Sequence, residues 1–77
     1  MNNQDMTIEE AEQLLAEVKE IGGTAKAVFA LPRAQFLSIM SRYGEAQYTF
    51  YKAGMYDKED ELAELEAFYH ERQYCNV

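Results

Sequence analysis

The residue types best suited to nucleophilic or metal chemistry are one histidine and one cysteine, His70 and Cys75, which lie five positions apart. Side chains on one side of a helix recur every three or four positions, so this pair is poorly placed as metal ligands or as a nucleophile with its base. Glu9, Glu10 and Glu12 are close in the chain, but neighbouring helical positions fan outward instead of converging on a metal. The sequence has no glycine-rich phosphate loop, nucleophile elbow or EF-hand pattern. We therefore expect no catalytic residue, no metal site, no cofactor and no enzyme activity.

Basic side chains near the middle of the chain could hold an anion, and the candidates are Lys26, Arg33 and Arg42. Residues 22–56 contain a single acidic residue, whereas the flanking segments are rich in Asp and Glu and bring the net charge to −7. This layout indicates either solvated outer helices around a less charged centre, or a basic patch for an anionic ligand.

Tyrosine is the most unusual feature of the composition, with six in 77 residues. Its large rigid apolar body and its hydroxyl suit either half-buried core packing or a binding surface. Gly44 would permit the close approach of two helices, and a symmetric contact between two Gln47 side chains would satisfy both amides. We expect an interface, between subunits or with a partner, formed by Tyr43, Gly44, Gln47, Tyr48, Tyr51 and Tyr56.

These interface candidates belong to, or directly follow, residues 32–54, which we expect to form one long amphipathic helix. Pro32 suits the first helical position, and Gly54 suits the left-handed conformation that ends a helix. The apolar arc of the helical wheel is roughly 200° wide, about twice what a one-sided surface helix needs, and predicts self-association. The arc contains Ile39, Phe50, Tyr43, Phe36, Met40, Tyr51, Leu37 and Tyr48, and the opposite side contains Lys52, Glu45, Ser38, Thr49 and Arg42.

Two further amphipathic helices should flank this central helix. Thr7 and Glu10 have the spacing of a capping box, which predicts a first helix over residues 8–20. Asp57 is a good N-cap, followed by an acidic first turn, and predicts a last helix over residues 58–73. Their apolar stripes at helical spacing indicate that both helices contribute to the core.

Residues 24–31 are ambiguous between a short strand and a short helix. Their apolar side chains alternate as in a strand, but their alanines and Thr24 as a possible cap favour a helix. We expect a helix, because the chain has no second strand with which this segment could pair.

The chain length allows a single domain, residues 1–77, with a flexible N-terminus at residues 1–6 and a flexible tail at residues 75–77. The predicted fold is all-α, a small bundle of three to four helices with one long central helix, residues 32–54, and it should be oligomeric because a core this small is marginal alone. One unpaired cysteine and the lack of an export signal predict a cytoplasmic location, and no apolar run is long enough to span a membrane.

The leading functional prediction is a small acidic non-catalytic binding protein, an inhibitor or adaptor that acts through contacts with itself and with another protein. Small acidic proteins of this kind are common in phages and mobile elements, which is an association and not a derivation. An acidic mimic of DNA is a variant of this prediction. Residues 22–44 also loosely resemble a helix-turn-helix DNA-binding regulator, in which Arg33, Gln35 and Arg42 would read the nucleic acid. A third hypothesis is an oligomeric protein that sequesters a planar anionic small molecule by stacking it on tyrosines.

Overall fold

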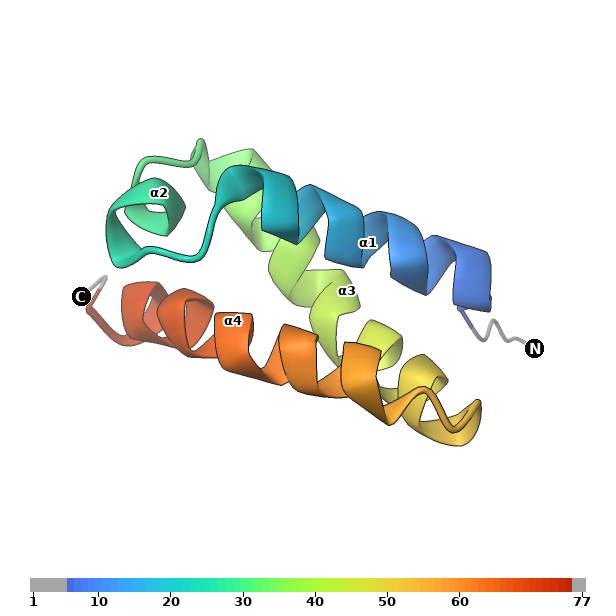
Figure 1. The fold of residues 1–77 in the computed structure, drawn as a ribbon. Helices are drawn as coiled ribbons and strands as arrows, with labels where there is room; N and C mark the ends of the chain where they lie inside the picture. Colours follow the sequence, from blue (N-terminus) through green and yellow to red (C-terminus); the bar gives the residue numbers. More distant parts are fainter. Residues whose placement is uncertain (1–5, 76–77) are drawn as a thin grey trace.

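The structure, a computed structural model, describes residues 6–75 of the chain. Within this range the backbone forms four helices and no strand: α1 (Ile8–Ile21), α2 (Ala25–Phe29), α3 (Arg33–Lys52) and α4 (Tyr56–Cys75) (Figure 1). The expected all-α fold is confirmed, and the ambiguous segment contains the short helix α2. The ends that we expected to be flexible lie outside the described residues, apart from Met6 and Cys75.

Side-chain caps begin the first two helices. The Thr7 hydroxyl accepts the Glu10 N–H at 3.1 Å while the Glu10 carboxylate accepts the Thr7 N–H at 3.0 Å, which confirms the capping box of α1. At the start of α2, the Thr24 hydroxyl accepts the N–H of Ala27 at 3.2 Å. Local sequence therefore determines where both helices begin.

α3 ends in a tight hydrogen-bonded turn at Gly54. The residue has φ of 75°, as expected, and the N–H of Met55 donates to the Phe50 carbonyl at 2.9 Å. The N–H of Gly54 donates to the Tyr51 carbonyl at 3.1 Å, which completes a Schellman motif. At the other end, Pro32 occupies the N-cap, one residue before the position that we expected for it.

α4 begins two residues earlier than the sequence indicated. Its first turn is closed by a bond from the Glu59 N–H to the Met55 carbonyl at 3.1 Å, so the helix already includes Tyr56. The expectation that Asp57 is the N-cap is therefore wrong, because the Schellman turn reverses the chain so quickly that α4 can start at once. Asp57 lies in the first turn, where its charge still favours the helix dipole.

The three long helices pack with α1 and α4 side by side and α3 crossing behind both (Figure 1). The short α2 lies near the C-terminal end of α4. Arg72 of α4 holds this end together, since its guanidinium donates to the carbonyls of Val28 and Leu31 at 2.8 and 2.9 Å. The same guanidinium lies 4.3 Å from the centre of the Phe36 ring, a cation–π contact with α3.

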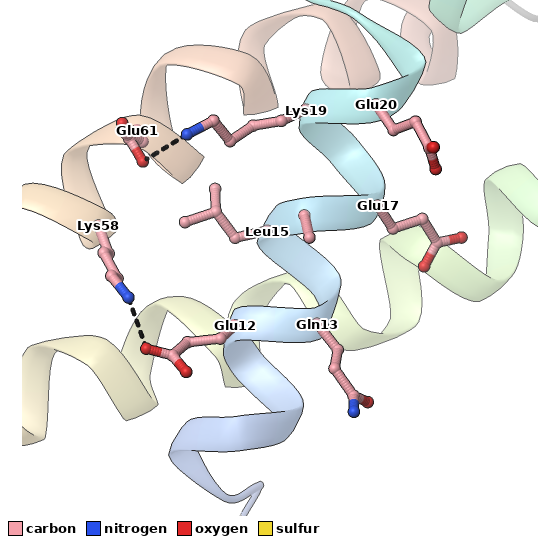
Figure 2. Close-up of a pocket in the computed structure, with 9 residues that line it drawn as sticks. Glu12, Gln13, Leu15, Glu17, Lys19, Glu20, Lys58 and Glu61 are labelled. Atoms are coloured by element: carbon pink, nitrogen blue, oxygen red, sulfur yellow. Dashed lines mark hydrogen bonds and ion pairs between the residues drawn. The ribbon is translucent and has the colours of Figure 1, made fainter.

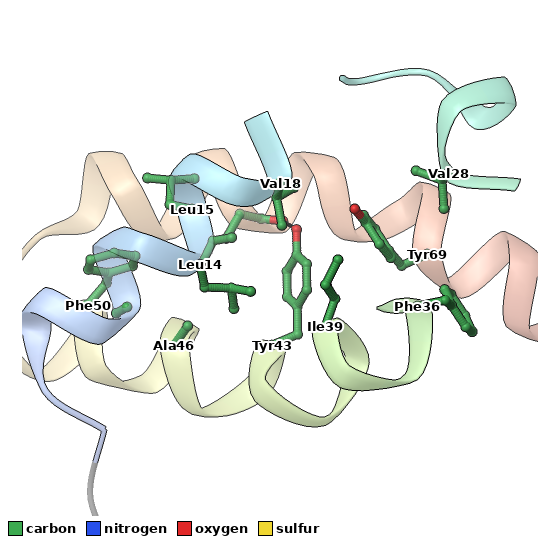
Figure 3. Packing of buried hydrophobic residues seen from close by; sticks show 12 residues of the cluster. Leu14, Leu15, Val18, Val28, Phe36, Ile39, Tyr43, Ala46, Phe50 and Tyr69 are labelled. Carbon is green, nitrogen blue, oxygen red and sulfur yellow. Dashed lines mark hydrogen bonds between the residues drawn. The ribbon is translucent and has the colours of Figure 1, made fainter. Parts of the chain in front are cut away.

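Two tyrosines fill the centre of the core. The Tyr69 ring stacks on Phe36 with centroids 6.1 Å apart, and it contacts the Tyr43 ring at 5.6 Å. The Tyr43 hydroxyl donates to the Leu62 carbonyl of α4 at 2.6 Å (Figure 3). Burial, with smaller contributions from Tyr69 and Glu66, raises the pKa of Tyr43 above its ordinary value and keeps this donor protonated. The buried apolar residues are Ala11, Leu14, Leu15, Val18, Val28, Phe36, Ile39, Tyr43, Ala46, Phe50, Leu62 and Tyr69.

Thr49 does not lie on an exposed polar side of α3. We expected it to face solvent, but its side chain is buried and its hydroxyl donates to the Met6 carbonyl at 3.1 Å. The chain before α1 covers this position and supplies a carbonyl that accepts the hydroxyl hydrogen. The buried side of α3 therefore does not coincide with the apolar arc of the helical wheel. It is shifted around the helix and includes Ala46 and Thr49.

Replacing each buried tyrosine by phenylalanine compares the Tyr43 hydroxyl, which forms a hydrogen bond, with the Tyr69 hydroxyl, which has no partner among the described residues. Tyr43→Phe should lower the free energy of unfolding by about 1 kcal/mol, because the hydrogen bond to Leu62 is lost. Tyr69→Phe should raise it by about 1 kcal/mol, because its buried hydroxyl has no hydrogen-bond partner among the described residues. Urea unfolding followed by circular dichroism measures both changes. A loss of stability in Tyr69→Phe would contradict this description of the core.

Candidate functional site

Of the two residues that first suggested chemistry, the structure describes the side chain of His70. His70 Nε2 lies 3.2 Å from a carboxylate oxygen of Glu66, one turn earlier on the same helix. The side chain of Cys75 lies outside the described part of the structure. Among residues 6–75, no group of three or more His, Cys, Asp or Glu is placed to hold a metal ion. Nor is any helix in that range both long and apolar enough to cross a membrane.

The three basic candidates for anion binding are not brought together. Arg42 is engaged inside the molecule, where it donates to Glu17 of α1 at 3.3 Å and to the Ser38 carbonyl at 3.1 Å. Arg33 lies nine residues earlier on α3, and nine residues correspond to about 180° around a helix. Lys26 belongs to α2. Arg33 and Arg42 therefore lie on different sides of α3 and do not converge on one anion.

The side of α3 away from the core carries large apolar side chains. Leu37, Tyr48, Tyr51 and Tyr56 each keep between 47% and 58% of their surface exposed. The rings of Tyr51 and Tyr56 contact each other with centroids 6.0 Å apart, and the Lys52 ammonium lies 4.7 Å from the centre of the Tyr48 ring. We call these four residues together with Gly44 the tyrosine face.

The other two interface candidates make contacts within the chain. Tyr43 belongs to the core, with 1% of its surface exposed, because α4 covers its part of the predicted arc. Gln47 is half-buried, and its amide donates to a Glu66 carboxylate oxygen at 3.1 Å. The amide thus has an internal partner and does not need a second Gln47.

An open groove lies between α1 and α4, on the side away from α3 (Figure 2). It has a volume of about 790 Å³, and its apolar lining residues are Ala16, which is exposed, and Leu15, which is almost fully buried. We call it the acidic groove; its charged lining residues are Glu12, Glu17, Lys19, Glu20, Lys58 and Glu61.

Two ion pairs cross the acidic groove. Lys58 of α4 pairs with Glu12 of α1, and Lys19 of α1 pairs with Glu61 at 3.5 Å. Leu15 lies between the two pairs (Figure 2). Beyond the Lys19–Glu61 pair the surface continues into a second hollow of about 270 Å³, lined in part by Glu64. The groove therefore has a small apolar floor at Leu15 and Ala16 and charged edges.

Charge is divided between the two sides of the molecule. α1 contains five acidic residues and one lysine, and α4 contains seven acidic and two basic residues. α2 and α3 together contain four basic residues and one acidic residue. The side formed by α1 and α4 is strongly negative, whereas the tyrosine face belongs to the mildly basic side.

The acidic groove was not predictable from the sequence. The ion pair between Glu12 and Lys58 joins residues 46 positions apart, and no local pattern indicates which surface acids meet which lysines. The charge of the chain runs from acidic to mildly basic and back to acidic. This order predicted the division of charge between the helices, but it did not predict a groove.

Searches of protein-family models, curated proteins and solved structures found no significant match to this chain.

Proposed function

We propose that this protein is a small non-catalytic binding protein that acts in the cytoplasm as an inhibitor or adaptor, by occupying a basic surface of another protein. The observation that carries the proposal is the acidic groove between the two most acidic helices. A groove with a small apolar floor at Leu15 and Ala16 and with charged edges suits an amphipathic helix, which places small apolar side chains against that floor. The acidic edges select a helix whose polar side carries Lys and Arg.

Glu20 and Glu64 are the acids best placed to meet such a partner. Both are exposed, and neither forms an ion pair with another described residue. Glu64 lines the second hollow, and Glu20 lines the outer edge of the acidic groove, where its side chain points away from α4 (Figure 2). Glu12 and Glu61 are already neutralised by lysines from the facing helix. A basic partner gains most from the acids that have no internal counterion, since it has no lysine to displace there.

The second part of the proposal is that the chain self-associates through the tyrosine face. Half-exposed tyrosines gather on the outer side of α3 and at the start of α4, and tyrosine is one of the residue types that dominate stable interfaces. Association there buries the less acidic side of the molecule and leaves the acidic groove open in every copy. Binding of a partner and self-association are therefore compatible.

Neutralising the unpaired acids of the groove tests the first part. Affinity capture from cells that make the protein, with mass spectrometry, supplies the partner, which is then purified. We expect the Glu20→Gln/Glu64→Gln double variant to bind it at least about tenfold more weakly, a loss of roughly 1.4 kcal/mol. The matched control is Glu45→Gln, an exposed acid on α3, which should bind as wild type does. Titration calorimetry at low and high salt measures the affinities.

Two results would contradict this assignment. One is a purified partner that binds the double variant as tightly as it binds wild type. The other is salt-sensitive binding of wild type to duplex DNA that Arg33→Ala weakens, which would favour the helix-turn-helix hypothesis instead.

Placing a charge on the tyrosine face tests the second part. Tyr51→Glu should give a monomer at concentrations where wild type associates, because the carboxylate would lose its water at the interface. Tyr74→Glu is the control, since Tyr74 is more exposed and lies at the far end of α4. Light scattering with size exclusion measures the mass, and circular dichroism checks that both variants stay helical. Equal masses for Tyr51→Glu and wild type would exclude this face.

A further inference from the structure

The tyrosine face has an order of residues that is symmetric about Gly44. Leu37 lies seven positions before this glycine and Tyr51 seven positions after it. Seven residues are nearly two helical turns, so both side chains lie within about 20° of the direction of Gly44 and about 10.5 Å from it along the axis. Leu37, Gly44 and Tyr51 thus form a straight line along the outer side of α3.

Gly44 is the position in this line that has no side chain. A Cβ atom built on it would have no heavy atom within 4 Å, so nothing inside the chain requires a glycine there. Its φ is not positive either, because the glycines with positive φ are Gly22 and Gly54 among the described residues. A glycine in a helix interior lowers helix stability relative to alanine. The missing side chain does, however, let the backbone of a second helix come close.

We infer that two copies pack their α3 helices antiparallel, across a two-fold axis that passes beside Gly44. This inference rests on the self-association proposed above. An antiparallel pair brings Leu37 of each copy against Tyr51 of the other, so the contact forms twice, as a two-fold interface requires. The two backbones cross closely at Gly44, and the larger side chains at plus and minus seven positions fill the space on either side.

The symmetric order about Gly44 favours a second copy as the occupant, and charge selects the antiparallel direction. Two chains of net charge −7 repel each other, and the repulsion is weakest when the mildly basic α3 sides meet and the acidic α1 and α4 sides point away. A parallel pair would place Arg33 of one copy beside Arg33 of the other. The antiparallel pair places each Arg33 near the start of α4 in the other copy, where Tyr56 and Asp57 are exposed. A guanidinium is attracted to both an aromatic ring and a carboxylate.

The available area sets the expected affinity. An aromatic side chain can bury roughly 150–250 Å², and the large side chains of the face are about half exposed. They supply about half of the roughly 800 Å² per partner that a standard interface buries, and the rest must come from polar neighbours on α3 and α4. We therefore expect a dissociation constant in the micromolar range, about 1–100 µM.

Adding a side chain at Gly44 gives the sharpest test. Gly44→Leu should raise the Tm of dilute, monomeric protein by about 4 °C or more, because leucine is the better helix former. The same variant should weaken dimerisation at least about tenfold, because the leucine side chain separates the two backbones. Glu45→Leu is the matched control: it adds the same side chain to an exposed position about 100° away around the helix and should leave the dimer within about twofold of wild type. Sedimentation equilibrium measures the association, and thermal circular dichroism measures the Tm.

Cysteine pairing tests the direction independently. In a Cys75→Ser background, a mixture of the Leu37→Cys and Tyr51→Cys chains should form the mixed disulfide under mild oxidation. Leu37→Cys alone should not cross-link, because the two positions lie about 21 Å apart along an antiparallel pair. Efficient cross-linking of Leu37→Cys with itself would overturn the antiparallel arrangement.

Two further outcomes distinguish the crossing at Gly44 from self-association in general. If Gly44→Leu dimerises as well as wild type while Tyr51→Glu is monomeric, the crossing at Gly44 is wrong and the proposed self-association stands. If wild type stays monomeric up to about 1 mM, far above the expected dissociation constant, both are wrong and the tyrosine face serves another molecule.

Discussion

The packing of two acidic helices onto one side of α3 is the constraint on which the rest of the structure depends. α1 and α4 each carry a large excess of acidic residues, and like charges on facing helices repel. The two helices meet over α3, the least charged of the three long helices, where the Tyr43 hydroxyl donates to the α4 backbone carbonyl of Leu62. Two lysines facing carboxylates on the opposite helix neutralise part of the remaining repulsion.

Both candidate binding surfaces follow from this arrangement. Because α1 and α4 lie side by side without filling the space between them, their outer side forms the acidic groove. Because both of them cover the same side of α3, no helix within residues 6–75 packs against the other side. Tyr48 and Tyr51 stay half exposed there for that reason. The protein therefore presents two sides of different charge and chemistry, one that we propose for a basic partner and one that we propose for another copy of itself.

Local sequence signals predicted the start of α1 and the end of α3, because these caps depend on neighbouring residues, but they misplaced the start of α4. The correct signals were the capping box of α1 and the left-handed Gly54 after α3. The helical wheel could not separate Tyr43 from Tyr51, which lie on one apolar arc, because it does not show which part of the arc other helices cover. Thr49 became buried for the same reason, through a segment 43 residues away in the chain. Tertiary packing decided these positions, and the groove between α1 and α4 is likewise a product of packing.

The central claim is that the tyrosines of α3 and its neighbours divide between a closed core and an uncovered face. Nitration by tetranitromethane, with the modified positions located by peptide mass spectrometry, tests it directly in protein dilute enough to be monomeric. The account predicts that Tyr48, Tyr51 and Tyr56 are nitrated while Tyr43 and Tyr69 stay protected until the chain unfolds. Nitration of Tyr43 and Tyr69 in the folded chain as fast as the others, or protection of all five, would contradict it.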